Sequence, residues 1–353
     1  MLTIVLPTYN ERENILETIT NIQKHIPKGQ AYEIIVSDDN SPDKTWKLVT
    51  DTFAKNKNIW CLRRKTNRGL SPAVIDAFAH AKGDILLVTD ADGQHDETKI
   101  PAMLQAIKHA DAVTGTRFAK EGSVKGWSKK RILMSKTAAT MAKPFLSQKI
   151  TDPMSGFFMI RKDAFEKVKD TINPKGYKIF LDILFRSEKL NVAEVPYQFK
   201  TRTKGESKLG SKVIIQYIIM LIKQFFRTKF FKFCIVGASG VIVNMGLLYL
   251  LTELAGLYYL VSSAIAIEIS IITNFLLNNA WTWRKQKTKS SFLKKMLKFN
   301  AVSLVALGIN FGALLFFTEV IGLWYIFSNL IGIALATIIN YGLNDKWTFK
   351  ETK

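Results

Sequence analysis

The hydrophobic and polar positions of this chain follow two patterns, and one gives way to the other near residue 230. Over the first 120 residues, short β-rich apolar runs alternate with amphipathic stretches of helix length. The expected strands are 3–6, 33–36, 59–62, 85–89 and 112–114, and the expected helices lie near 14–25, 45–54, 72–81 and 100–109. This alternation predicts an α/β fold in which a mostly parallel sheet carries helices on both faces.

After residue 230 four long apolar runs follow one another. They are Phe233–Leu251, Tyr258–Leu277, Phe299–Phe317 and Trp324–Leu343. Each is close to the ~20 residues that a helix needs to cross a bilayer. The pattern therefore predicts an all-α domain of four transmembrane helices over residues 230–353, joined to a soluble domain over residues 1–210.

The membrane part is also an internal repeat. When the chain is shifted by 66 residues, 20 of the 52 positions between 232 and 283 are identical to their partners, and no gap is needed. The matched residues include Lys232 with Lys298, Asn278 with Asn344, and Trp281 with Trp347. Because each repeat contains two crossings, we expect two parallel repeats related by an axis along the membrane normal.

The net charge is +21 and the hydrophobic fraction is 48%, and so basic a chain suits either nucleic acid or an anionic membrane surface. The placement of the charges favours the membrane surface over a nucleic-acid groove. Lys and Arg gather in 223–232, 284–298 and 346–353, at one set of helix ends, whereas 253–257 and 319–323 contain none. Positive charge favours the cytoplasmic side. We therefore expect the N-terminal domain and both termini in the cytoplasm.

Two basic, partly apolar segments predict amphipathic helices. One is 127–146, and the other is the linker 211–229, whose apolar run 213–222 is broken only by Gln216 and is too short to span a bilayer. Both suit helices lying in the headgroup plane, and a core helix of the soluble domain is the alternative. The two cysteines and four histidines of the chain form no disulfide framework and no ligand cluster.

Candidate chemistry begins at Asp90 and Asp92, which follow the buried run 85–89. Residues two apart on a strand face the same way, so both carboxylates are expected at its carboxyl end, where open α/β sheets bind ligands. Oxygen ligands at this spacing suit Mg²⁺ or Mn²⁺, which also hold phosphate oxygens. A solvated turn is the alternative.

Acidic residues end two further strands, at Glu11 and at Asp38 and Asp39. Each alone could be a turn with a helix cap. Three acidic strand ends in one sheet favour a nucleotide site, because carboxylates there can accept hydrogen bonds from a base or ribose.

These motifs together resemble the family-2 (GT-A fold) glycosyltransferases. The resemblance covers residues 1 to about 210 and rests on Pro7-x-Tyr9-Asn10-Glu11, Asp38-Asp39-Asn40-Ser41, Arg68-Gly69-Leu70, Asp90-Ala91-Asp92, Gly115-Thr116-Arg117-Phe118 and Ser155-Gly156-Phe157. Asp39–Asp43 and the run Gly205-x-Ser207-Lys208-Leu209-Gly210 are most similar to the dolichol-phosphate mannose synthases, although Lys44 stands where those usually have Gly. Residues 230–350 resemble the GtrA-like four-helix membrane domains.

The resemblance implies inverting, metal-dependent transfer of mannose from GDP-mannose to dolichyl (polyprenyl) phosphate, with Asp92, Arg117 and Arg131 as catalytic residues. It implies a metal on Asp90, Asp92 and Gln94 and an acceptor phosphate near Arg117, Arg131, Ser135, Arg202 and Lys208. The implied donor-binding residues are Pro7, Tyr9, Asn10, Glu11, Val36, Asp38, Asp39, Arg68, Asp90, Ala91, Asp92 and Gln94.

Other functions stay open at this point. UDP-glucose is the alternative donor. A processive polysaccharide synthase is a second enzyme class, although the chain lacks the Gln-x-x-Arg-Trp signature of such enzymes. A lipid flippase or scaffold with an inactive sugar-nucleotide domain lies outside the enzyme class. Glu268, inside the second crossing, is either functional or a hydrogen-bond partner of another helix.

Overall fold

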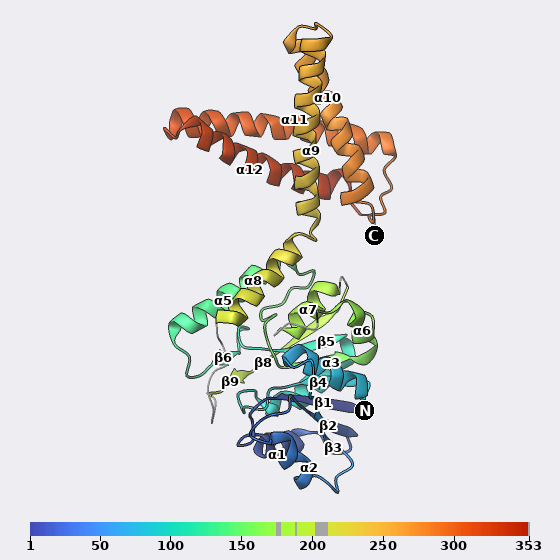
Figure 1. Cartoon of the computed structure of the whole chain (residues 1–353), viewed down its shortest axis with the longest axis vertical. Coiled ribbons are helices and arrows are strands. Elements are labelled where there is room, and N and C mark those ends of the chain that lie inside the picture. Colours follow the sequence, from blue (N-terminus) through green and yellow to red (C-terminus); the bar gives the residue numbers. More distant parts are fainter. Residues whose placement is uncertain (174–177, 188, 202–210, 352–353) are drawn as a thin grey trace. The chain divides into compact units, whose positions relative to one another are not determined.

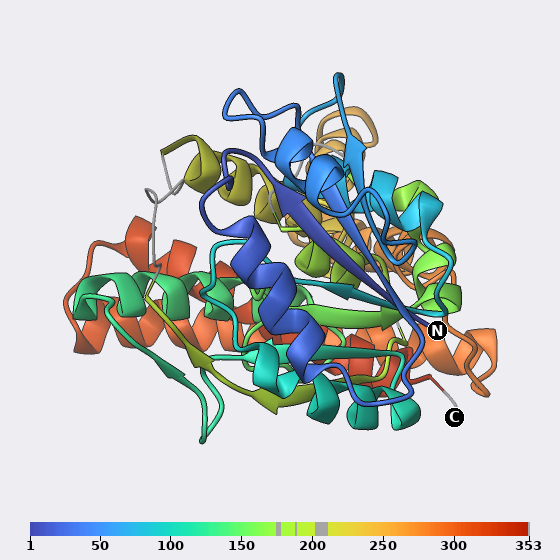
Figure 2. The same cartoon turned by 90° about the horizontal axis from the view of Figure 1, so that it is seen from below.

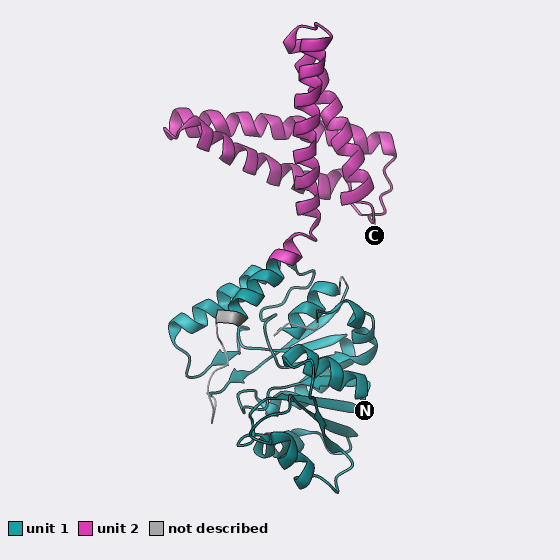
Figure 3. Ribbon diagram, viewed as in Figure 1, with its two compact units in different colours: residues 1–221 teal, residues 222–353 magenta. Residues whose placement is uncertain are grey.

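A computed structural model describes residues 1–173, 178–187, 189–201 and 211–351, without the side chains of residues 211 and 212. The chain divides into two compact units, residues 1–221 and residues 222–353 (Figure 3). Each unit is described by itself.

The first unit alternates strands with helices along the chain (Figure 1). Its strands are β1 Leu2–Thr8, β2 Tyr32–Asp38, β3 Ile59–Arg63, β4 Ile85–Val88, β5 Ala112–Thr116, β6 Ser123–Val124, β7 Phe158–Arg161, β8 Val192–Pro196 and β9 Gln198–Phe199. Its helices are α1 Ile15–His25, α2 Thr45–Thr52, α3 Leu70–His80, α4 Ile100–Ala106, α5 Lys129–Ala142, α6 Lys162–Glu166 and α7 Ile179–Arg186. Helix α8, Ser211–Phe225, begins in this unit and continues four residues past its last residue, Leu221. Short 3₁₀ turns lie at Glu97–Lys99, Ile107–His109, Lys143–Phe145 and Lys169–Thr171.

In the described part of this unit, seven strands form one sheet in the order β3-β2-β1-β4-β7-β5-β8. All neighbours are parallel except β7, which runs antiparallel to both β4 and β5. Strands β6 and β9 form a separate two-stranded sheet. The mostly parallel sheet confirms the predicted fold class. The sequence pattern did not indicate β7 and β8 of this sheet or the strands β6 and β9.

Helices cover both faces of the large sheet (Figures 1 and 2). Side chains alternate along a strand, so β1 sends Leu2, Ile4 and Leu6 to the core shared with α1, α2 and α4. Val5 of the same strand faces the core shared with α3, α6 and α7. Burial on both sides explains why the central strands read as unbroken apolar runs.

Helices α5 and α8 lie side by side, and the Tyr217 hydroxyl donates to the Ala138 carbonyl oxygen at 2.5 Å (Figure 1). Their shared core contains Ala139, Ala142 and Leu221. Both helices also leave large apolar side chains exposed, namely Leu133, Met134 and Met141 on α5 and Ile214, Ile215, Ile218 and Ile219 on α8. Both segments are therefore helical, as expected, and each combines a packed face with an apolar exposed face.

Among its described residues, the second unit contains four helices that are long and apolar enough to cross a membrane. They are α9 Lys229–Tyr249, α10 Tyr259–Leu277, α11 Phe292–Leu315 and α12 Tyr325–Leu343. Each continues into a π-helical turn, at Leu250–Leu254, Asn278–Thr282, Phe316–Val320 and Asn344–Thr348. The helices α9 and α11 begin before the apolar runs because Thr228 and Ser291 cap them through their hydroxyl oxygens.

The 66-residue shift also relates the packing of the two halves. The Phe233 ring lies 5.7 Å from Tyr341, and its counterpart Phe299 lies 5.7 Å from Phe275. Trp283 and its counterpart Phe349 stack on each other, with centroids 4.4 Å apart and planes at 6°. A pseudo-two-fold axis therefore passes close to this stacked pair.

Candidate active site

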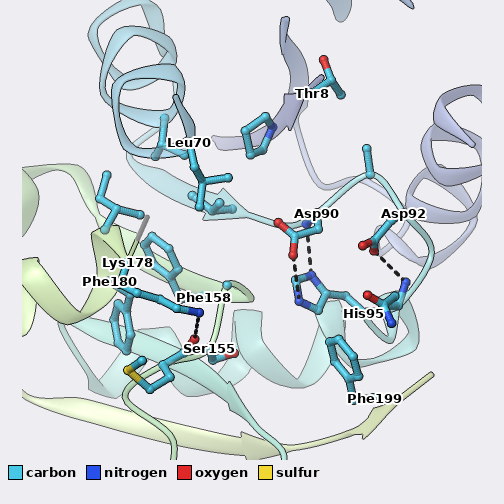
Figure 4. Close-up of a pocket in the computed structure, with 18 of the residues that line it drawn as sticks. Thr8, Leu70, Asp90, Asp92, His95, Ser155, Phe158, Lys178, Phe180 and Phe199 are labelled. Carbon is cyan, nitrogen blue, oxygen red and sulfur yellow. Dashed lines mark hydrogen bonds and ion pairs between the residues drawn. The ribbon is translucent and has the colours of Figure 1, made fainter. Parts of the chain in front are cut away.

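A cavity of about 770 Å³ lies at the carboxyl ends of β1 and β4 (Figure 4). Its wall combines residues that follow β1, β2, β4 and β5 with the loop before β7 and the helices α3, α5 and α7. Parallel strands bring their carboxyl ends to the same sheet edge, which explains why motifs far apart in sequence meet here.

The carboxylates of Asp90 and Asp92 both line this cavity. Asp92 is 4% exposed, and its Oδ1 accepts a hydrogen bond from the Gln94 backbone N–H at 3.1 Å. Removal from water raises the pKa of Asp90; His95 opposes this shift, whereas the negative charges of Asp92 and Glu11 add to it. The site is therefore an anionic cluster that a cation would stabilise.

The donor set fits a hard divalent cation. Among the described residues, no three His, Cys, Asp or Glu side chains are placed to hold a metal by themselves. Mg²⁺ usually keeps waters and binds one or two carboxylates together with substrate phosphates, so Asp90 and Asp92 are sufficient. Gln94 donates its amide Nε2 to the Lys200 carbonyl oxygen at 3.1 Å, which leaves its amide oxygen as the end able to meet a cation.

His95, which the sequence pattern did not single out, lies under this cluster. Its Nδ1 accepts the Asp90 backbone N–H at 3.0 Å, so the ring proton of the neutral imidazole is on Nε2, 3.7 Å from Asp90 Oδ2. The ring is 2% exposed and stacks on Phe157 at 5.2 Å. The imidazole is thus fixed by its packing and faces the Asp90 carboxylate (Figure 4).

Most of the expected donor-binding residues line the cavity, namely Pro7, Tyr9, Glu11, Asp39, Arg68, Asp90, Ala91, Asp92 and Gln94. Asp39 accepts the Gly69 backbone N–H at 2.6 Å and pairs with the buried Arg64 guanidinium. Burial raises the pKa of Asp39, although Gly69 and Arg64 both oppose the shift. The carboxylate is therefore held in one orientation at the cavity wall.

Three other residues expected to bind the donor do not line the cavity. They support the structure around it instead. Val36 is fully buried in the core of β2 and its side chain cannot reach a ligand. Asp38 is also fully buried, and its oxygens accept from the Thr8 hydroxyl at 3.0 Å and from Ser41 N and Oγ at 2.8 and 2.6 Å. Asn10 has a φ of 57°, and its backbone N–H donates to Ser41 Oγ at 3.0 Å. These residues shape the loops after β1 and β2.

Arg117 lies in the cavity wall and forms a bidentate pair with Asp152. Its Nε donates to Oδ2 at 2.7 Å and its Nη2 to Oδ1 at 2.9 Å. Burial alone would lower the pKa of Arg117, but the Asp152 carboxylate raises it above its usual value. Asp152 therefore fixes one edge of the guanidinium fork, and the Nη1 end remains to meet a ligand in the cavity.

Arg131 lines the same wall from the first turn of α5. Its guanidinium lies over the Trp127 ring, 4.2 Å from the centroid. Ser135, one turn later, is not part of the lining. The predictions for Arg202 and Lys208 lie outside the described residues.

Lys178 is a further cation of the cavity, and the sequence pattern gave no indication of it (Figure 4). Its ammonium donates to the Met154 carbonyl oxygen at 3.3 Å. Burial lowers the pKa of Lys178 and Arg117 lowers it further, while Asp90 and Asp152 oppose the shift. Two cations close together in a largely dry wall favour an anionic ligand between them.

Comparisons with known proteins agree with these motifs. Residues 3–169 match glycosyl transferase family 2, and residues 232–350 match the GtrA/DPMS transmembrane domain. The chain is 39% identical to a dolichol-phosphate mannosyltransferase of Pyrococcus furiosus over 98% of each protein. It is 36% identical to a dolichol-phosphate mannosyltransferase of Saccharomyces cerevisiae, over 68% of this chain and 90% of that protein.

A solved structure of the mannosyltransferase PcManGT from Pyrobaculum calidifontis, in complex with GDP-Man and Mn²⁺, is also similar. It has a TM-score of 0.47 and 15% identity, and the match covers 99% of this chain and 88% of that one.

Proposed function

Because the chain belongs to the dolichol-phosphate mannosyltransferases of glycosyl transferase family 2, we propose that it transfers mannose from GDP-mannose to dolichyl (polyprenyl) phosphate, with inversion, at the cytoplasmic membrane face. The chain is a multi-pass membrane protein.

One observation supports the proposal most directly: both kinds of charge that a phosphate-to-phosphate transfer needs line a single cavity. The cavity is lined by three carboxylates, those of Glu11, Asp90 and Asp92. It is also lined by three cations, Arg117, Arg131 and Lys178. A donor diphosphate needs its charge neutralised, and an acceptor phosphate needs guanidinium or ammonium donors. An inactive scaffold would have no need of such a pairing.

The acceptor phosphate requires no activating base. Its second pKa is about 6, so its oxygens are already anionic at neutral pH. One of them forms the bond to the anomeric carbon of mannose while the bond from that carbon to the diphosphate oxygen breaks and GDP leaves. A single displacement inverts the configuration, so an α-linked donor gives a β-linked lipid product.

The residues of the cavity orient the two substrates. Asp39, held by Arg64 and Gly69, is placed to accept hydrogen bonds from a base or ribose. Arg117, braced by Asp152, and Arg131, laid over Trp127, hold the incoming phosphate. A divalent Mg²⁺ or Mn²⁺ held by Asp90, Asp92 and Gln94 would neutralise the charge of the departing diphosphate.

The lipid side of the cavity is indicated by α5. The helix that carries Arg131 into the cavity wall also exposes Leu133 and Met134, which are 66% and 47% accessible. Apolar side chains beside basic ones suit a helix in the headgroup plane, where a polyprenyl phosphate ends. The Lys- and Arg-rich helix ends favour the cytoplasmic side for this domain.

In the deciding experiment, membranes that contain the protein are incubated with a polyprenyl phosphate and a labelled sugar nucleotide. The sugar nucleotide is GDP-mannose in one sample and UDP-glucose in the other. We expect label in the lipid fraction from GDP-mannose, and at least about 100-fold slower labelling by protein that carries Asp92→Asn. Labelling from UDP-glucose alone would refute the donor, and no transfer from either donor would favour the scaffold.

Two further measurements test the finer points. The one-bond C1–H1 coupling of the lipid product distinguishes the β from the α anomer. Sealed vesicles of known orientation, supplied with GDP-mannose on one side only, test the membrane face.

A further inference from the structure

The two repeats of the membrane unit keep a lysine and a tryptophan at matching positions. The Lys232 ammonium lies 5.6 Å from the ring centroid of Trp281, and the matching Lys298 lies 5.0 Å from that of Trp347. In each hairpin the lysine is in the first turns of one helix and the tryptophan in the last turn of the other. The pseudo-two-fold axis thus relates two lysine–tryptophan pairs, and both pairs lie at the lysine-rich end of the hairpins.

The π-helical turns explain why these tryptophans lie outside the core. In Asn278–Thr282, the wide turn is closed by a hydrogen bond from the Trp283 backbone N–H to the Asn278 carbonyl oxygen at 2.9 Å. Trp283 is 2% exposed, whereas Trp281 is 45% exposed and has the Lys232 ammonium over its ring. The second repeat is built in the same way. Turns of this kind interrupt the regular helical bonding and occur often at functional sites.

The lysines of these pairs are not neutralised by acidic residues. Their neighbours are engaged across the axis: Lys229 lies 3.8 Å from Asp345, and Lys295 donates to the Asn279 amide oxygen at 2.8 Å. Within the part of the chain that the structure describes, Lys232 and Lys298 have no carboxylate at ion-pair distance, and Lys298 donates only to the Trp347 carbonyl oxygen, at 3.4 Å. Their charge therefore remains available to an anion.

We propose that Lys232 with Trp281, and Lys298 with Trp347, form two equivalent binding sites for the phosphate group of a membrane lipid. An ammonium supplies three donors and an indole N–H supplies one, and a phosphate offers only acceptors. The exposed indole is half apolar, so it can also contact the first carbons of a lipid tail at the membrane surface. Phospholipids and polyprenyl phosphates share this chemistry.

The test counts lipids on the intact protein, solubilised in detergent, by native mass spectrometry with added phosphatidylglycerol or polyprenyl phosphate. We expect two saturable lipid phosphates, with one site weakened in Lys232→Gln, the other weakened in Lys298→Gln and both weakened in the double variant. Each removed ammonium should weaken its site about fivefold. Trp281→Leu should weaken only the site of Lys232.

The matched control is Lys285→Gln with Lys289→Gln, which removes two charges from the loop between the hairpins. Equal lipid loss in this control would overturn the proposal, because binding would then follow total charge. Displacement of the lipids by the same concentration of inorganic phosphate would also overturn it. The proposal is supported if the parent and control proteins retain either lipid better than the double variant does. The lipid that the parent protein binds more tightly, phosphatidylglycerol or polyprenyl phosphate, identifies the source of the phosphate. None of these outcomes depends on which sugar nucleotide the catalytic domain uses.

Discussion

The buried pair of Arg117 and Asp152 allows a quantitative test of how the cationic wall of the cavity is built. Asp152 is fully buried and Arg117 is 9% exposed, and two hydrogen bonds of 2.7 and 2.9 Å join their side chains. The substitution Asp152→Asn keeps the shape of the side chain and removes its charge. The guanidinium would then remain in the wall without its counter-ion.

The expected cost follows from the burial of the pair. Removing one partner of a buried ion pair typically destabilises a protein by about 3–5 kcal/mol. The lower end, about 3 kcal/mol, is expected here, because the amide oxygen of Asn can keep one hydrogen bond and Asp90 also attracts the guanidinium. For a domain of this size, 1 kcal/mol corresponds to about 2–4 °C, so the unfolding midpoint should fall by about 6–12 °C.

The assay is thermal unfolding of the intact protein in detergent, with Asp170→Asn as the control. Asp170 is an exposed carboxylate of the same unit, and its substitution should leave the midpoint nearly unchanged. Replacing both partners, with Arg117→Met and Asp152→Leu, should recover much of the lost stability while transferase activity stays absent. A midpoint for Asp152→Asn equal to that of Asp170→Asn would refute the reasoning.

Three further predictions follow from contacts of single residues. Asp92→Asn should lower turnover by about 100-fold or more and weaken Mn²⁺ binding to the GDP-bound protein, measured by electron paramagnetic resonance; unchanged Mn²⁺ affinity would contradict the metal assignment. Arg131→Gln should raise the KM for polyprenyl phosphate about tenfold and leave that for GDP-mannose unchanged, whereas Lys129→Gln on the same helix should alter neither. Gly240→Ala would place a methyl group 2.3 Å from Asn274 Nδ2 and should destabilise the membrane unit by about 1–3 kcal/mol, whereas Gly237→Ala, with nothing within 4 Å, should be neutral in the same thermal scan.

The strand–helix alternation and the apolar runs predicted the fold class and the four long helices, because both patterns are local. Parallel strands place the residues that follow them at one edge of the sheet, so the sequence also indicated which acidic residues would lie close together. Glu11, Asp39, Asp90 and Asp92 all line the cavity. Asp38 illustrates the limit of this reasoning. Successive side chains along a strand point to opposite sides. The Asp39 carboxylate therefore lines the cavity, whereas the adjacent Asp38 carboxylate holds the loop after β2 through Ser41.

The rest of the site depends on contacts that no local pattern contains. Asp152 is 35 residues from Arg117, and Lys178 reaches the cavity from the start of α7. His95 is next to the acidic motif, but its role follows only from the backbone N–H that fixes its tautomer. The π-helical turns gave no signal because an apolar period does not distinguish a widened last turn from a regular one.

Lys44 shows the opposite case, in which the structure explains a departure noticed in the sequence. It stands where related synthases usually have Gly, and its φ is 63°, in the left-handed region. A non-glycine residue there is strained, and its neighbours hold it: Ser41 accepts its backbone N–H at 3.1 Å. Position 44 thus retains the backbone conformation that favours glycine.

The reversed direction of β7 has a consequence for how this enzyme could diversify. For a parallel strand of this sheet, the segment that follows the strand reaches the edge where ligands bind. Because β7 runs the other way, the segment that precedes β7 reaches this edge. That segment contains Asp152, Ser155 and Gly156. In the function proposed above, segments that follow strands form the donor side of the cavity, and a segment that precedes a strand forms part of the acceptor side. Changes in that single entry loop could retune the lipid substrate while the nucleotide-binding half of the sheet is inherited intact.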